Sequence, residues 1–330
     1  MVRKNLKKEE KQKKKGCFSR IVYWCLFFIF VYFGVTALSY ADTLKFAHVS
    51  DVHFSDKSVD TSYKILSHSK ELLRDVVIQI NQAPNIDFVI ETGDLIDKPR
   101  KDFLDSAIIE MNRLKAPWYF AFGNHDAAIG TSFKKDRYFE YLKNRNKAMK
   151  SFDKFYYSFT PKKGYRVIVL DASIDYKVTA TGEIQQEQLE WLDKELKKAQ
   201  TNKELPLIFL HHPIQEPFPS FNHRIVNAEE VKEIINNHPI PMAIFSGHYH
   251  ATKIYKENNI LHVSTPSLVT YPNAFRIISI TNLKNKIIFT FDFRETNLKE
   301  LQKKAKLMTF SSNMLKGEQS DQNTIVILDK

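Results

Sequence analysis

The sequence is poor in cysteine and tryptophan, with two cysteines and three tryptophans among 330 residues. Both cysteines, Cys17 and Cys25, lie near the start of the chain. The remainder therefore forms no disulfide, binds no metal through a thiolate and uses no cysteine nucleophile. An exported domain of this kind needs no oxidative folding, which suits a bacterial envelope.

Net positive charge is also small outside one segment. The formal net charge is +11, but +7 of it lies in residues 1–20. The rest of the chain is only mildly basic, so we expect no nucleic-acid partner. The hydrophobic fraction of 43% and the aromatic fraction of 13% are those of a folded protein with a sizeable core.

An uncharged apolar run, Ile21–Leu38, follows the basic segment. Its length of about 27 Å as a helix is enough to cross a bilayer, and we predict a membrane segment here. Ser39–Ala41 could be a signal-peptidase site, although the run is longer than usual for a cleaved signal, which slightly favours a retained anchor. In either case the positive flank stays in the cytoplasm, and the main domain is expected on the non-cytoplasmic side.

These features divide the chain into four predicted parts. Residues 1–20 form a basic cytoplasmic tail, and residues 21–41 a transmembrane anchor or signal peptide. Residues 42–295 form the main domain. Residues 296–330 contain a helix, predicted at Asn297–Met308 because its apolar residues share one face, and a polar tail whose residues 311–323 are predicted to be mobile.

Short apolar runs alternate with helical patterns in the main domain. Two helices are predicted, at about Ser67–Asn81 and Glu187–Ala199. The predicted strands are Leu44–Ser50, Asp87–Thr92, Pro117–Phe122, Tyr165–Leu170, Pro206–His211, Pro241–Ser246, Phe275–Ile280 and Lys286–Phe291. This alternation predicts an α/β fold built as layers of sheet and helix.

Five polar segments each follow a predicted strand. They are Asp51-Val52-His53, Gly93-Asp94, Gly123-Asn124-His125-Asp126, His211-His212-Pro213 and Gly247-His248-Tyr249-His250. Ligands of open α/β sheets bind at the carboxyl ends of the strands, so these side chains are expected to meet at one edge. In Asp51-x-His53 and His248-x-His250, an extended backbone would point both side chains the same way.

The donor types point to metal chemistry. Oxygen and nitrogen donors without thiolate suit Mn, Fe or Zn in a catalytic site rather than a structural zinc cage. Two divalent ions beside Asp51 and Asp94 would keep a net positive charge that attracts a hydroxide and a phosphate. Two-metal sites of this type catalyse displacement at phosphorus.

The ordered set of motifs resembles the calcineurin-like metallophosphoesterases, over about Leu44–Phe293. The resemblance implies an α-β-β-α sandwich of two mixed sheets for the main domain, and two divalent metal ions (Mn, Fe or Zn). It implies that Asp51, His53 and His250 bind one metal, that Asn124, His211 and His248 bind the other, and that Asp94 bridges them. A metal-held hydroxide would be the nucleophile.

Two further residues have catalytic roles by the same resemblance. His125 would protonate the leaving oxygen or stabilise charge on the phosphoryl group, and Asp126 would orient its ring. His212 either touches substrate or packs behind His211. Asp97 is either a second-layer residue of the site or a turn residue before Pro99.

Departures from known subfamilies narrow the resemblance. The motifs of purple acid phosphatases have a glycine and a tyrosine at the positions that His53 and Asp97 occupy here. This difference argues against a purple ferric centre. In protein Ser/Thr phosphatases an arginine follows the motif that corresponds to Gly93–Asp97. Here Lys98-Pro99 follow it, which argues against that subfamily. The helix signature Gly182–Leu192 and the segment Ser264–Arg276 resemble the branch of bacterial cyclic-nucleotide phosphodiesterase-like enzymes.

The sequence therefore predicts hydrolysis of a phosphodiester or phosphomonoester outside the cytoplasmic membrane, on a small-molecule or cell-envelope substrate. A non-catalytic metal-binding scaffold and a nuclease are the alternatives. No obligate protein partner is evident. We assign the other histidines to the core or the surface: His48, His68, His223, His238 and His262. Substrate choice is expected to depend on the loops Ser55–Tyr63, Ala127–Tyr138 and Pro213–Val226.

Overall fold

The computed structural model describes residues 43–55, 59–127 and 133–330. Apart from Thr43, they belong to one compact unit, Leu44–Lys330. The predicted membrane segment at residues 21–38 lies outside the described residues. Within the described ranges, no helix combines the length and the apolar character that a membrane span requires.

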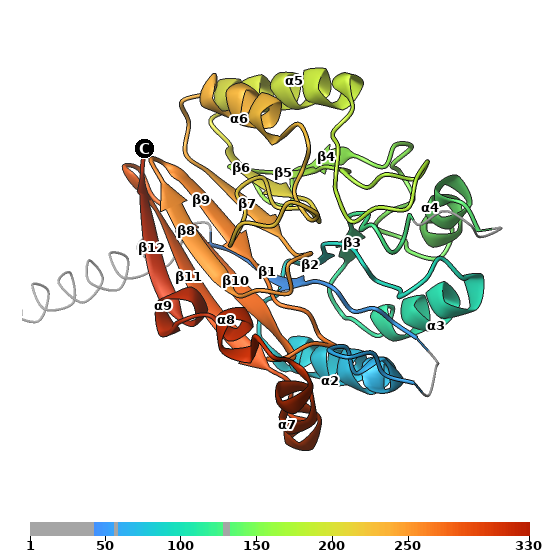
Figure 1. Cartoon of the computed structure of the whole chain (residues 1–330). Helices are drawn as coiled ribbons and strands as arrows, with labels where there is room; N and C mark the ends of the chain where they lie inside the picture. Colours follow the sequence, from blue (N-terminus) through green and yellow to red (C-terminus); the bar gives the residue numbers. More distant parts are fainter. Residues whose placement is uncertain (1–42, 56–58, 128–132) are drawn as a thin grey trace, which may run out of the picture. The chain divides into compact units, whose positions relative to one another are not determined.

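Strands and helices alternate through most of this unit (Figure 1). The strands are β1 (Thr43–Val49), β2 (Phe88–Glu91), β3 (Trp118–Phe120), β4 (Tyr157–Phe159), β5 (Tyr165–Val169), β6 (Leu205–Phe209), β7 (Met242–Ser246), β8 (Lys253–Glu257), β9 (Ile260–Ser264), β10 (Ala274–Asn282), β11 (Lys286–Glu295) and β12 (Thr324–Asp329). The helices are η1 (Leu66–His68), α2 (Ser69–Gln82), α3 (Lys101–Met111), α4 (Lys135–Lys143), α5 (Gln186–Asn202), α6 (Ala228–Asn236), α7 (Lys299–Met308), α8 (Ser312–Lys316) and α9 (Gln319–Gln322).

The strands form two six-stranded sheets, ordered β12-β11-β10-β1-β2-β3 and β4-β5-β6-β7-β9-β8. In the first sheet β1, β2 and β3 are parallel, whereas β10, β11 and β12 are antiparallel. In the second, β5, β6, β7 and β9 are parallel, with β4 and β8 antiparallel at the edges. Both sheets are mixed, as predicted.

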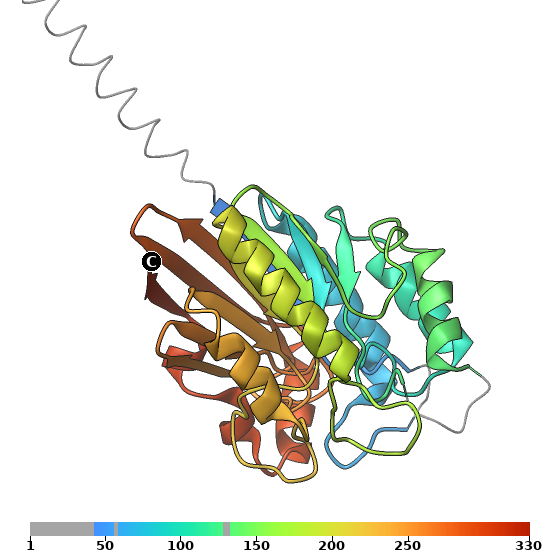
Figure 2. The ribbon, with the colours of Figure 1, turned by 90° about the horizontal axis from the view of Figure 1, so that it is seen from above.

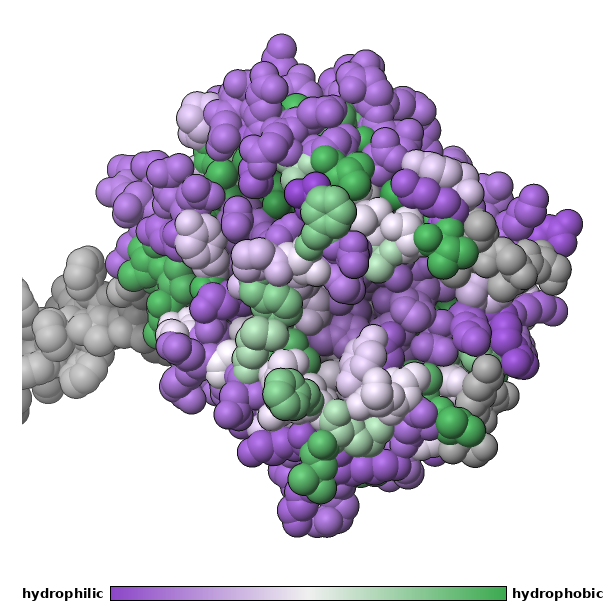
Figure 3. All heavy atoms as spheres, in the orientation of Figure 1, coloured by the Kyte–Doolittle hydropathy of each residue, from purple (hydrophilic) through white to green (hydrophobic). Residues whose placement is uncertain are grey.

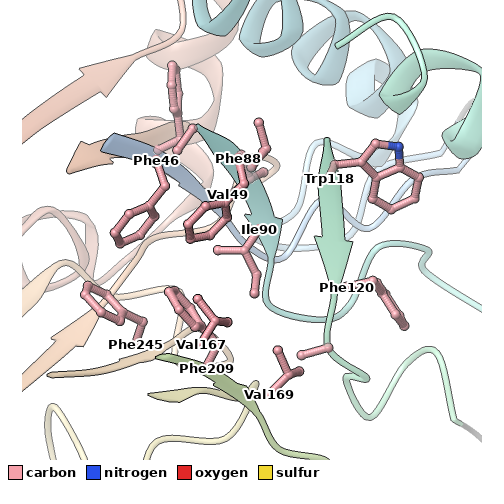
Figure 4. Close-up of a cluster of buried hydrophobic side chains, with 14 of the residues drawn as sticks. Phe46, Val49, Phe88, Ile90, Trp118, Phe120, Val167, Val169, Phe209 and Phe245 are labelled. Atoms are coloured by element: carbon pink, nitrogen blue, oxygen red, sulfur yellow. The ribbon is translucent and has the colours of Figure 1, made fainter. Parts of the chain in front are cut away.

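Aromatic side chains fill the space between the sheets (Figure 4). Phe46 of the first sheet meets Phe209 and Phe245 of the second edge-on, with ring centroids 5.5 and 5.4 Å apart. Phe88 stacks on Phe46 at 5.0 Å. All four rings are buried, so the two sheets share one apolar core.

Helices cover the outer faces of the sheets (Figures 1 and 2). On α5 the residues Leu192 and Leu196 pack against Ile208 of β6 and Ile244 of β7 in a second apolar cluster. Helices α2 and α3 pack on the first sheet through residues such as Val76 and Leu104. The observed layers are helix, sheet, sheet and helix, which confirms the predicted sandwich.

The predicted strands and helices are present, but β4, β8, β9 and β12 and the helices α3, α4 and α6 were not predicted from the sequence. The prediction for the C-terminal segment needs correction. Helix α7 packs through Leu298, Leu301, Ala305 and Met308, as predicted. Residues 311–323, predicted to be mobile, instead contain α8 and α9, and the strand β12 pairs with β11 at the sheet edge.

A buried arginine explains why this segment is ordered. Arg276 on β10 has no exposed surface. Its guanidinium donates hydrogen bonds to the carbonyl oxygens of Asp321 at 2.7 Å and Gln322 at 3.3 Å. Because an unpaired buried cation is costly, these two carbonyls tie the end of α9, just before β12, to the sheet.

Candidate metal centre

The five polar segments follow strand ends, as predicted. Asp51 and Asp94 come just after the parallel neighbours β1 and β2, and Asn124 follows β3. In the second sheet His211 follows β6, and His248 follows its parallel neighbour β7. Residues separated by up to 199 positions are thus brought to one place by the topology of two sheets.

The seven predicted ligands fall into two groups around Asp94. In the first, His250 Nε2 lies 3.3 Å from both Asp51 Oδ1 and His53 Nε2. In the second, His211 Nε2 lies 3.1 Å from His248 Nδ1 and 3.2 Å from Asn124 Oδ1.

Asp94 connects these groups. Its Oδ2 atom is 3.5 Å from His53 Nε2 and 3.4 Å from His211 Nε2. Ligand atoms of Asp51, His53 and His250 lie within 4.8 Å of one another, as do those of Asp94, His211 and His248. This is the division that the resemblance implied, although the ligand assignments themselves stay predictions.

The backbone of these residues differs from the expectation. Asp51, His53, Asp94, His248 and His250 have φ values of 53°, 43°, 59°, 67° and 53°. They adopt the left-handed conformation. The extended backbone predicted for Asp51-x-His53 and His248-x-His250 is therefore wrong. Non-glycine residues rarely adopt it, and the tight turns after the strands impose it here.

Two motif glycines allow a close approach between segments. A Cβ atom at Gly123 would collide with the backbone nitrogen and the carboxylate of Asp94. A Cβ atom at Gly247 would collide with Ser50 Oγ and the carboxylate of Asp51. The glycines of these two motifs therefore make room for the carboxylates of the site.

Second-layer hydrogen bonds orient the imidazoles. His211 Nδ1 donates to the carbonyl oxygen of Thr92 at 2.7 Å, so its Nε2 turns to the cluster. His250 Nδ1 lies 2.9 Å from Thr270 Oγ1, with the same effect. Such partners fix which ring nitrogen remains free to bind a metal.

The donor set fits divalent metal ions. Asp51 Oδ1 faces the cluster, is buried and has no hydrogen-bond partner within the described part of the chain. Burial lowers the pKa of His53 and His248 well below 6.5, so both imidazoles are neutral. Neutral imidazoles, carboxylates and an amide oxygen are ligands for Mn, Fe or Zn.

The negative charge of the site is evident at His211. Burial lowers the pKa of this histidine, but the carboxylates of Asp94 and Asp51 outweigh burial and raise it to about 9. A field that holds a proton on a buried imidazole would also attract a cation.

His125 borders the cluster and is oriented by a backbone group. Its Nδ1 donates to the carbonyl oxygen of Asp97 at 2.7 Å, and its side chain is 33% exposed. The prediction that Asp126 orients this ring is therefore wrong. Of the two alternatives for Asp97, the structure supports a position in the second layer of the site.

Asp126 instead holds the turn that carries Asp94. Its buried carboxylate accepts hydrogen bonds from the backbone nitrogens of Asp94, Ile96 and Gly123 and from Tyr138 Oη. An acceptor on the side chain satisfies donors that a tight turn leaves unpaired. Asp126 thus shapes the site without facing it.

Lys64 is a site residue that was not predicted from the sequence. It is 4% exposed, and its Nζ lies 3.3 Å from His53 Nδ1 and 3.4 Å from His125 Nε2. No ion pair among the described residues includes it. A lone lysine in a loop has no spacing signal, so only the fold reveals its position.

A cavity of about 580 Å³ adjoins the cluster at His248 and His250. His223, assigned to the core or surface, lines it, with its ring centroid 5.2 Å from that of His248. His212 has no exposed surface and lies edge-on to His211, so it packs behind this residue. His48 is a core residue that hydrogen-bonds Thr92 and Thr265.

Comparisons with known proteins agree with this geometry. The family model described as calcineurin-like phosphoesterase matches residues 44–252. A probable glycerophosphodiester phosphodiesterase GpdQ of Arcobacter nitrofigilis is 27% identical over 227 residues, covering 66% of this chain and 77% of the relative. A 3′,5′-cyclic-nucleotide phosphodiesterase of a Nostoc species is 26% identical over 226 residues, covering 68% and 78%.

One solved structure shares the fold. A dimetal phosphatase from Danio rerio superposes with a TM-score of 0.61 at 19% identity, covering 74% of this chain and 95% of that protein. At this identity the likeness concerns the fold alone.

Proposed function

The chain belongs to the calcineurin-like phosphoesterase family, and on that premise we propose that it hydrolyses phosphodiesters at a site for two divalent metal ions. It is a hydrolase by membership of this family. The observation that carries the two-metal proposal is the division of the predicted ligands into two groups joined by Asp94 Oδ2, which lies 3.5 Å from His53 and 3.4 Å from His211.

Each part of the site has a distinct task in this proposal. Asp51, His53 and His250 would hold one ion, and Asn124, His211 and His248 the other. When bound, the ions would supply Lewis-acid activation of the phosphoryl group and of water. Proton transfer and further stabilisation of the phosphoryl group are the tasks of protein side chains that are not metal ligands.

His125 is placed to pass a proton to the departing oxygen. Nδ1 donates to the carbonyl of Asp97 and Nε2 lies beside Lys64 Nζ at 3.4 Å, so Nε2 is the ring nitrogen that would pass a proton to a substrate. The partial exposure of the ring supports this role, since a leaving alcohol must reach it. The named activities of the relatives favour a diester over a monoester.

Purified protein loaded separately with Mn, Fe and Zn provides the test. We expect hydrolysis of bis-p-nitrophenyl phosphate that disappears after chelation and returns on adding metal. The same samples should bind about two ions per chain by elemental analysis. Folded protein with two bound ions and no turnover of any phosphodiester would refute the proposal.

Lys64 is expected to stabilise the phosphoryl group. Its ammonium lies buried beside His125 Nε2 and in no ion pair of the described residues, so it can pair directly with an anionic substrate. We expect Lys64→Met to lower kcat/KM for a phosphodiester by roughly 10- to 100-fold. Lys70→Met is the matched control, because Lys70 is exposed on α2. Undiminished kcat/KM in Lys64→Met would mean that this lysine only packs.

We propose further that the domain works outside the cytoplasmic membrane. The support is the basic segment of residues 1–20 followed by the uncharged run Ile21–Leu38. Labelling intact cells with a membrane-impermeant, lysine-reactive reagent would modify the domain if it is outside. Protection from the reagent until lysis would contradict this location.

A further inference from the structure

The C-terminal segment, residues 299–316, completes a wall of the cavity beside the metal centre. Met308, Thr309, Phe310, Ser311 and Leu315 line the cavity together with His248 and His250. The family model ends at residue 252, so this wall lies beyond the matched region. It is a feature of this chain that the motifs do not predict.

Packing holds this wall against two loops of the site, the loop with Lys64 and the loop with His248 and His250. Helix α7 shares an apolar cluster with Ile65, next to the loop that carries Tyr63 and Lys64. Leu315 packs on Tyr249, between the predicted ligands His248 and His250. The backbone nitrogen of Thr252 donates to the carbonyl oxygen of Leu315 at 2.8 Å. The segment thus has a defined position relative to the site.

Phe310 is the most exposed residue of this wall. Its relative exposure is 108%, although the adjacent Thr309 is buried and donates through both its backbone nitrogen and Oγ1 to the carbonyl of Ala305. An aromatic ring is therefore held in solvent by an ordered backbone. In Figure 3 hydrophobic side chains over α7 and α8 border a hydrophilic hollow at the centre of the face.

Other aromatic rings line the same cavity as Phe310. The Tyr63 ring lies 6.0 Å from that of His250. Phe218 meets Tyr249 edge-on at 5.1 Å. Serines and a threonine line the same cavity, whereas none of the described lining residues is aspartate, glutamate, lysine or arginine. The cavity therefore suits a neutral group with aromatic faces and a few polar atoms.

We infer that this cavity binds a neutral, flat aromatic group on one ester arm of the substrate, with Phe310 as a residue that selects it. The inference rests on the proposed phosphodiesterase function and names its substrate class. A volume of about 580 Å³ is typical of a site for an organic ligand and much larger than a phosphate alone requires. A second phosphate on the same arm would find no cation among the lining residues, so a nucleobase-like or aryl phosphodiester fits better than a diphosphate.

The test compares two diesters on the metal-loaded protein. Thymidine 5′-(p-nitrophenyl phosphate) carries aromatic rings, and glycerophosphoethanolamine carries none. We expect Phe310→Ala to lower kcat/KM for the aromatic diester about tenfold more than for glycerophosphoethanolamine, chiefly through KM, because stacking on the ring is lost. Phe310→Trp should retain the preference for the aromatic diester.

Two further variants sharpen the result. Leu307→Ala is the matched control, because Leu307 is 89% exposed on α7 but does not line the cavity. Phe310→Leu keeps an apolar side chain without a flat ring and should behave like Phe310→Ala. If Phe310→Ala lost the same factor in kcat/KM on both diesters, or if Phe310→Leu kept the full preference for the aromatic diester, this inference would be overturned and the proposed function would stand. Failure of metal-loaded wild-type protein to cleave either diester would overturn the proposed function itself.

Discussion

Asp94→Asn is expected to lower kcat/KM for bis-p-nitrophenyl phosphate by about a thousandfold and to reduce bound metal below two ions per chain. Asp94 Oδ2 faces both ligand groups, at 3.5 Å from His53 Nε2 and 3.4 Å from His211 Nε2. Asparagine keeps the shape and tolerates the left-handed backbone at φ 59°, so mainly the charge is lost. Several kcal/mol of Lewis-acid stabilisation depend on that charge.

The measurements are steady-state kinetics and elemental analysis of the same preparation. Asp105→Asn is a matched control, since Asp105 lies on the surface of α3 in an ion pair with Arg145. Thermal unfolding should show that both variants fold. If Asp94→Asn bound two ions per chain and kept more than a tenth of the activity, Asp94 would not bridge the metals.

His125→Ala is expected to leave metal content intact and to lower kcat by about 10²- to 10⁴-fold for a diester with an alkyl alcohol as leaving group. The ring sits beside the cluster but is held by the carbonyl oxygen of Asp97 rather than by a carboxylate. If its task is to protonate the leaving oxygen, the loss must depend on how poor that leaving group is.

Two substrates separate this role from a structural one. For bis-p-nitrophenyl phosphate, whose leaving group departs without a proton, the loss in His125→Ala should be much smaller than for glycerophosphoethanolamine. His68→Ala is the control, because His68 is partly exposed at the start of α2 and pairs with Glu71. The same loss on both substrates would assign His125 to phosphoryl binding instead of proton transfer.

Buried strands were the predictable part of the fold. β1, β2, β6 and β7 are rich in Phe, Val, Ile and Leu, and they are buried along nearly their whole length. β8 was missed because it is an edge strand with the sequence Lys-Ile-Tyr-Lys-Glu, half exposed. β12 was missed because a short apolar run does not reveal its partner, β11.

Strand-end motifs were the predictable part of the site. The order of Asp, Asn and His residues, and the family that it resembles, led to all seven predicted ligands, which the fold places in two groups joined by Asp94. The role of Asp126 was wrong because adjacency to His125 in sequence says nothing about where a carboxylate points. Lys64 and Phe310 belong to loops without a repeated pattern, and only tertiary packing brings them to the site.

The pairing of Arg276 with the end of α9 predicts how alleles that truncate the C-terminal segment behave. A frameshift at codon 317 would leave every predicted metal ligand encoded, yet it would remove the two carbonyl oxygens that pair with Arg276 and uncover β11 as a sheet edge. A buried guanidinium left with the carbonyl oxygen of Ser264 as its one remaining hydrogen-bond acceptor among the described residues, together with an open edge, favours degradation and aggregation. Such an allele would behave as a null despite an intact motif set, and inspection of the motifs alone would misclassify it as functional.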